Sequence, residues 1–230
     1  MISNESVRAP CVAGHAGDRF VAEAIRHRHV IAEPGKSVLF TRPQTRPTIE
    51  TDRLLLQPIG PFALACRTYH WTKHPELFLY IGMRTSGWTF RRYYRDLRAR
   101  ARRSKGEMRS IIEKATGKLV GLHLIHVSSG TASTTIIIGK DHWGSGFHQE
   151  IGPVIMDHCF HVLNVVKISN SVAAGNTRSA ANMERFGYLL EGRLRLEFPL
   201  RDGTLDDKLV YGITRADWET LQHKTGRQAS

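Results

Sequence analysis

The chain has 230 residues, 41% of them hydrophobic, which fits one domain or one domain plus an extension, without any apolar run that could span a bilayer. Its three cysteines, Cys11, Cys66 and Cys159, are odd in number and far apart, which argues against a disulfide framework or a zinc cluster and favours a cytoplasmic protein. The formal net charge of +12 favours acidic or phosphate-bearing partners, but no zinc-finger or helix-turn-helix pattern singles out nucleic acid.

Residues 1–47 are predicted to form an N-terminal extension or arm. The first residues lack the apolar stretch of a secretory signal. Asp18 can cap a short amphipathic helix at 19–28, and the prolines near residue 47 favour an irregular, extended connector. The arm can pack on a partner subunit or stay loosely ordered; its role and a homodimer are both left open.

Residues 48–230 are predicted to form one mixed α/β domain. The apolar patterns predict strands at 49–58, 107–114, 118–127, 130–138, 165–172, 188–198 and 208–214. They predict helices at 62–72, 88–104, 147–163, 177–186 and 215–224.

The predicted helix at 88–104 carries an arginine stripe on the side opposite its apolar residues. The stripe consists of Arg91, Arg95, Arg98 and Arg102. We expect a solvated helix face by default. The alternative is a contact for an acidic protein, ribosomal RNA or an anionic small molecule.

A glycine loop between a strand and a helix is the most informative motif. The sequence WGSGF at 143–147 follows the β-branched run at 134–138 and precedes the predicted helix. Glycines let the backbone approach a ligand closely, and free N–H groups at a helix N-terminus bind phosphate. Taken alone, a Gly-x-Gly sequence favours an ordinary strand-to-helix turn.

Four segments in the same order give the domain a family resemblance. They are IETDRLLL at 49–56, WGSGF at 143–147, NTRS to RFGY at 176–188, and EGR at 191–193 with Asp206, Asp207 and Tyr211. Together they resemble the GNAT-fold N-acetyltransferases, and among these the RimJ/RimL-type branch that acetylates ribosomal-protein N-termini.

The resemblance implies a GNAT fold, with a mixed, mostly antiparallel sheet that splays apart where acetyl-CoA binds. In that fold the amides of pantetheine pair with the splayed backbone, one N–H serves as oxyanion donor, and the loop holds the pyrophosphate. The implied contacts are Ile136, Ile137, Ile138, Trp143, Gly144, Ser145, Gly146 and Phe147. Trp143 is expected to pack under the loop rather than on the ligand.

The resemblance also implies roles for three polar side chains. Asn176 would bind the pantetheine arm or orient a substrate group, unless it is a helix N-cap. Ser179 would hydrogen-bond the leaving CoA sulfur, unless it bonds a backbone carbonyl. Glu197 is the candidate base that takes a proton from the acceptor ammonium, with a surface glutamate as the alternative.

Two further residues are candidates for contact with the acceptor. His123 would line the acceptor cleft or would be a hydrogen-bonded structural histidine. It faces away from His126 on the same strand, so the two cannot form a metal pair. Asp206 would contact the acceptor amine or serve a hairpin turn.

Two positions depart from the family pattern. Asp141 stands three residues before the first loop glycine, where Gln or Arg is common, and its charge is unfavourable near a pyrophosphate unless it points away. Met183 stands where many relatives carry a tyrosine as general acid.

We therefore expect an acetyl-CoA-dependent N-acetyltransferase without a metal, in which the amine attacks the thioester directly. The favoured acceptor is a protein N-terminus, and the alternative is a small-molecule amine such as a polyamine, amino sugar or antibiotic. Rival hypotheses are a catalytically weak CoA-binding sensor or scaffold and a nucleic-acid-associated protein.

Overall fold

The computed structural model describes residues 46–80, 87–102, 106–200 and 202–228. The expected helix at 19–28 and most of the expected extension lie outside the described residues. Arg46 and Pro47, at the end of that extension, contact the domain core through Glu107 and Arg109. The boundary at residue 48 stays a prediction.

The described strands form one mixed sheet with the order β1-β2-β3-β4-β5-β6-β8-β7. Neighbouring strands are antiparallel, apart from the parallel pair β5 and β6. The strands are β1 (Ile49–Glu50), β2 (Leu54–Pro58), β3 (Glu107–Glu113), β4 (Leu119–Ser128), β5 (Thr131–Ile138), β6 (Lys167–Ala173), β7 (Leu189–Pro199) and β8 (Leu205–Thr214).

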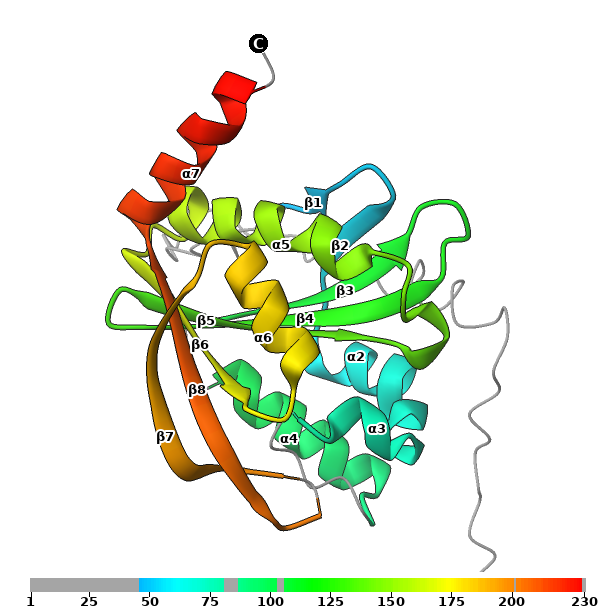
Figure 1. Ribbon diagram of the computed structural model, residues 1–230. Helices are drawn as coiled ribbons and strands as arrows, with labels where there is room; N and C mark the ends of the chain where they lie inside the picture. Colours follow the sequence, from blue (N-terminus) through cyan, green and yellow to red (C-terminus); the bar gives the residue numbers. More distant parts are fainter. Residues whose placement is uncertain (1–45, 81–86, 103–105, 201, 229–230) are drawn as a thin grey trace, which may run out of the picture. The chain divides into compact units, whose positions relative to one another are not determined.

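Helices cover both faces of this sheet, with α5 on one side and α2, α3 and α4 on the other (Figure 1). The helices are α2 (Pro61–Thr68), α3 (Pro75–Phe78), α4 (Phe90–Arg102), α5 (Phe147–Asp157), α6 (Thr177–Arg185) and α7 (Arg215–Gln228). Short 3₁₀ turns follow α2 and β5, and a π-helical turn, His158–Val162, extends α5.

The alternation of side chains along each strand divides the apolar core between the two faces. On β3, Ile111 packs in the core under α5, whereas Met108 packs with α2 and α4. On α4, Tyr93 and Leu97 are buried, and the four arginines of the stripe are exposed. A helix with one buried side and one charged side is what the sequence pattern predicted.

The expected strand at 49–58 is wrong in one respect, because it is two strands joined by a tight turn. The N–H of Thr51 donates to the carbonyl of Leu54 at 3.0 Å, and β1 then pairs antiparallel with β2. This turn places Arg53 at the surface, where it reaches another part of the chain. The four-residue helix α3 was not predicted, because a single turn is too short to show helical periodicity.

A charge cluster of Glu107, Arg109 and His158 lies buried between the sheet and α5. Arg109 donates to Oε2 of Glu107 from Nε at 2.9 Å and from Nη2 at 2.6 Å. His158 Nε2 lies 3.0 Å from the same oxygen, and the side chains of all three residues are at most 5% exposed. Arg109 also donates from Nη1 to the carbonyls of Pro47 and Leu56. A buried charge is tolerated because it is paired and hydrogen-bonded in this way.

Strands β5 and β6 separate soon after they begin to pair. Their parallel register covers two positions, Thr131 with Lys167 and Ala132 with Ile168. Beyond them the Asn170 side chain bridges the strands, accepting from the N–H of Thr134 at 2.8 Å and donating to its hydroxyl at 3.1 Å. The remainder of β5 runs along an open gap, which agrees with the splayed sheet that the resemblance implies.

Candidate functional site

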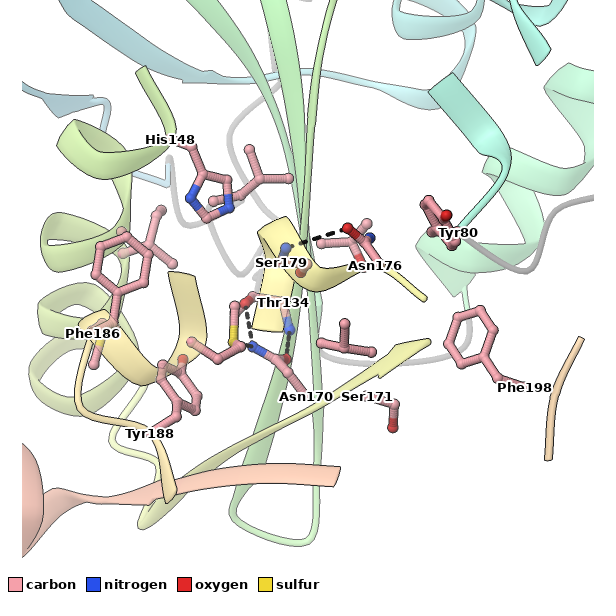
Figure 2. A pocket seen from close by; sticks show the side chains of 17 residues that line it. Tyr80, Thr134, His148, Asn170, Ser171, Asn176, Ser179, Phe186, Tyr188 and Phe198 are labelled. Carbon is pink, nitrogen blue, oxygen red and sulfur yellow. Dashed lines mark hydrogen bonds between the residues drawn. The ribbon is translucent and has the colours of Figure 1, made fainter. Parts of the chain in front are cut away.

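Two adjoining cavities occupy the gap between β5 and β6 and the space beside it. The larger, about 620 Å³, follows the glycine loop and the start of α6, and the smaller, about 240 Å³, lies between the strands. Both are lined by Tyr80, Ile136, His148, Asn176 and Ser179, and most of these side chains are visible in Figure 2. The combined volume is in the range of small-molecule and cofactor sites.

The backbone of β5 presents polar groups to this gap at alternate residues. Because the N–H of Thr134 points toward β6, the N–H groups of Ile136 and Ile138 point the same way, and Ile137 directs its own toward β4. The carbonyl of Ile138 already accepts the indole N–H of Trp143 at 2.9 Å. Of the three isoleucines expected to bind through their backbone, Ile136 and Ile138 therefore have the required orientation.

The glycine loop leaves alternate N–H groups available for a ligand. The N–H groups of Trp143 and Ser145 donate to carbonyls of the preceding turn, at 3.1 and 3.4 Å. Those of Gly144, Gly146 and His148 have no acceptor within the part of the chain that the structure describes. Three free donors at the start of α5 form a site suited to phosphate.

The two loop glycines have backbone angles that other residues resist. Gly144 has φ +82° and Gly146 has φ +79°, both in the left-handed region. Ser145 stabilises the loop between them, because its hydroxyl donates to the carbonyl of His142 at 2.7 Å. Phe147 is buried below the loop as the first residue of α5.

Trp143 does not pack under the loop, contrary to expectation. Its side chain lines the larger cavity and is 44% exposed. The indole N–H bonds the end of β5, and this bond draws the ring to the mouth of the cleft. Asp141 is exposed and lines neither cavity, so its carboxylate meets the condition that it points away from the loop donors.

The start of α6 brings Asn176 and Ser179 to the junction of the two cavities. Asn176 is the N-cap of α6, and its Oδ1 accepts from the N–H of Ser179 at 3.2 Å (Figure 2). This bond uses the oxygen of the amide, so the cap role and a ligand contact through Nδ2 are compatible. Met183, one turn further, is buried, and its sulfur lies 3.8 Å from Nδ2 of Asn170. A thioether at this position cannot donate a proton.

The structure does not bring Glu197 into the cleft, which corrects the expectation of a catalytic base. Its side chain is 52% exposed, and its carboxylate pairs with Lys208 at 2.9 Å. The neighbouring Phe198 lines the smaller cavity instead. The register of β7 shifts by two residues between Leu194 and Phe198, so the strand is irregular where Glu197 lies.

His123 is placed away from both cavities. Its side chain is fully buried, and neither ring nitrogen has a hydrogen-bond partner within the described residues. Burial, together with the nearby Arg109 charge, lowers its pKa to about 3, so the ring is neutral. The sequence suggested either a contact with the acceptor or a hydrogen-bonded structural histidine. This environment matches neither role.

Asp206 holds the turn that precedes α6. Its Oδ2 accepts from the N–H of Gly175 at 2.7 Å, and its Oδ1 accepts from the N–H of Asp207 at 2.8 Å. Asp206 lines neither cavity. This geometry favours a role in a turn over a contact with the acceptor amine. The turn is the one before α6 and not the expected hairpin turn.

Two side chains at the site were not indicated by any sequence pattern. Tyr80 follows the unpredicted helix α3 and lines both cavities. His148 lies where the cavities meet and stacks on Phe186, with the ring centroids 5.6 Å apart. Burial and the Arg178 charge lower the pKa of His148. No local pattern marks either residue, because their positions depend on how distant segments pack.

The family model described as acetyltransferase (GNAT) domain matches residues 53–189 of this chain. The chain belongs to this family. The match includes β5, the glycine loop and α6, which together build the cleft.

No described helix of this GNAT protein has the length and apolar character needed to cross a membrane. Among the residues that the structure describes, no group of three or more His, Cys, Asp or Glu side chains could hold a metal ion.

Similar proteins include an uncharacterized N-acetyltransferase, p20, of Bacillus licheniformis. It is 29% identical over 112 residues, which cover 47% of this chain and 62% of that protein. A spermidine N(1)-acetyltransferase of Vibrio cholerae is 33% identical over 108 residues, which cover 46% of this chain and 62% of that protein. The chain thus spans less than two thirds of either relative.

A solved structure supports the fold. Spermidine N-acetyltransferase from Vibrio cholerae, in complex with CoA and spermine, has a TM-score of 0.63 to this chain at 20% identity. The alignment covers 72% of this chain and 98% of that chain.

Proposed function

We propose that this GNAT protein is an acetyl-CoA-dependent N-acetyltransferase acting on a primary amine. The observation that carries the proposal is the set of N–H groups at Gly144, Gly146 and His148, which have no acceptor among the described residues and lie next to the open backbone of β5. The first set suits a pyrophosphate, and the second suits the amides of pantetheine. The two meet in one cleft, as a ligand with both groups requires.

The residues of the chain bind, orient and polarise the reactants. Acetyl-CoA supplies the activated acetyl group as a thioester. The N–H of Ile136 or Ile138 points into the gap and is the proposed donor to the oxygen on which negative charge develops. Ser179 is the proposed hydrogen-bond donor to the departing sulfur. Proximity and this donor supply most of the rate in the proposal.

The proposed acceptor is a small-molecule amine, as for the Vibrio cholerae relative, whose name specifies spermidine. The lining of the smaller cavity contains no Asp, Glu, Lys or Arg side chain among the described residues, and it includes Tyr80, Ser171 and Phe198. Without a carboxylate in that lining, a polycation would lose its hydration there without compensation. We therefore favour an amine with one cationic group, and its proton is lost to solvent before attack.

A protein N-terminus and the RimJ/RimL branch remain predictions. The exposed arginine stripe of α4 is compatible with an acidic or ribosomal partner, but a solvated helix face explains it equally well. A cytoplasmic location and a homodimer also remain predictions.

A panel of acceptors tests the proposed function. Purified protein is incubated with acetyl-CoA and with monoamines, spermidine, amino sugars and short peptides, and thiol release is followed. Turnover of a monoamine supports the proposal, and preference for peptides with free N-termini would favour the RimJ/RimL alternative. CoA binding without turnover on any acceptor would instead indicate a sensor or scaffold.

Two substitutions separate the candidate catalytic residues. Ser179→Ala should lower kcat while the Kd of CoA changes little, because the hydroxyl is proposed to act at the sulfur. Glu197→Gln should leave kcat unchanged, because Glu197 lies outside both cavities. A fall in kcat for Glu197→Gln comparable to that of Ser179→Ala would reinstate the glutamate as a base.

A further inference from the structure

Arg53 reaches from the turn between β1 and β2 to the back of the glycine loop. Its Nη1 donates to the carbonyl of Ser145 at 3.0 Å, and its Cζ lies 4.8 Å from the centre of the Phe147 ring. Its Nε pairs with Oε2 of Glu150, in the first turn of α5, at 2.7 Å. A single side chain thus contacts three successive parts of the loop and helix.

The carboxylate of Glu150 fixes the turn that carries Arg53. Its Oε1 accepts from the backbone N–H of Arg53 at 2.8 Å and from the hydroxyl of Thr51 at 2.5 Å. Arg53 is therefore held at both its backbone and its side chain. The guanidinium geometry matters here, because a fork of donors can bond a carboxylate and a carbonyl at once, and a lysine ammonium cannot copy that arrangement.

The contact with Ser145 determines the direction of one free donor. In a planar trans peptide, the C=O of one residue and the N–H of the next point in opposite directions. Because Arg53 holds the carbonyl of Ser145 behind the loop, the N–H of Gly146 in the same peptide unit points to the opposite side. That N–H is one of the three without an acceptor in the described chain, and Gly146 lines the larger cavity.

We propose that Arg53 is a positioning residue that aims the N–H of Gly146 at the pyrophosphate of acetyl-CoA. The inference rests on the proposed function, since it concerns the same binding site. Arg53 does not line either cavity, so it acts through the loop. Its effect should appear in the affinity for the pyrophosphate-bearing ligand and be small in the chemical step.

The test compares Arg53→Met and Arg53→Lys with the unsubstituted protein. Arg100→Met is the matched control, because Arg100 forms an ion pair of the same 2.7 Å length with Asp96 on α4. For each protein the Kd of CoA, kcat and the thermal midpoint are measured. We expect the Kd of CoA to rise about tenfold or more in both Arg53 variants, while kcat changes less than threefold. In Arg100→Met, neither the Kd of CoA nor kcat should change.

A truncated donor separates positioning from general damage. S-acetyl-pantetheine lacks the pyrophosphate, so its KM should be the same in Arg53→Met as in the unsubstituted protein. Equal weakening with both donors would show a merely structural role, and full affinity in Arg53→Lys would show that charge alone matters; either result overturns the inference. If the unsubstituted protein itself does not bind CoA, the proposed function fails first.

Discussion

Glu107→Gln should destabilise the protein strongly, because it removes the anion from the buried charge cluster. The substitution keeps the shape of the side chain but leaves Arg109, which is fully buried, without its counter-charge. Breaking a buried ion pair by removing one partner typically costs about 3–5 kcal/mol. We therefore expect a fall of about 3 kcal/mol or more in the free energy of unfolding at pH 7.

The pH dependence gives an independent estimate of the same contribution. Burial alone would raise the pKa of Glu107, but the hydrogen bonds from His158 and Arg109 and the charge of Arg109 outweigh it and lower the pKa from 4.5 to about 2. A depressed pKa stabilises the folded state above pH 4.5, and the stabilisation disappears as the pH falls toward 2. The shift corresponds to about 3 kcal/mol at pH 7 and about 1 kcal/mol at pH 3.

Urea unfolding of both proteins between pH 7 and pH 3 checks this reasoning. The difference in unfolding free energy between the unsubstituted protein and Glu107→Gln should shrink by about 2 kcal/mol over this range. Glu219→Gln, at an exposed position on α7, is the control and should change stability little. A difference below 1 kcal/mol at pH 7, or one that does not vary with pH, would refute the role given to the cluster.

Three further changes have expected outcomes. Gly152→Ala should lower the unfolding free energy in urea by about 1–3 kcal/mol, because the added methyl overlaps the Phe186 ring; unchanged stability would show that the ring moves freely. Asn170→Ala should cost about 1–3 kcal/mol in the same assay by leaving the N–H of Thr134 without its acceptor. Gly146→Ala should weaken CoA binding in calorimetry roughly 5- to 30-fold, since φ +79° costs other residues about 1–2 kcal/mol; equal affinity would exclude that conformation.

The fold could be predicted largely from local patterns. Long elements such as α5 and β5 show the period of a helix or the β-branched composition of a strand. The structure contains β5 close to its expected limits, whereas α5 ends at Asp157 and reaches its expected end only through the π-helical turn that follows it. The exceptions are short. The turn at Thr51 and the helix α3 each depend on a few residues, too few for periodicity to reveal them.

The residues of the site also fall into two groups, those that a local sequence motif indicates and those whose position depends on distant parts of the chain. The glycine loop and the cap at Asn176 are local motifs, and the structure brings both to one cleft. Glu197 was misplaced because β7 is irregular between Leu194 and Phe198, where it has two more residues than its partner β8, and no local pattern reports this irregularity. Tyr80 and Arg53 reach the site from far along the chain, so only the folded structure reveals them.

The bond from the indole of Trp143 to the carbonyl of Ile138 joins the end of β5 to the glycine loop. Bonds from the N–H groups of Gly139, His142 and Trp143 also order the residues between them. Together these bonds restrain the span between the loop N–H groups and the N–H of Ile136. The cleft should therefore select ligands by length. The distance between the anionic group and the reactive end of a ligand should matter as much as the chemistry of either group.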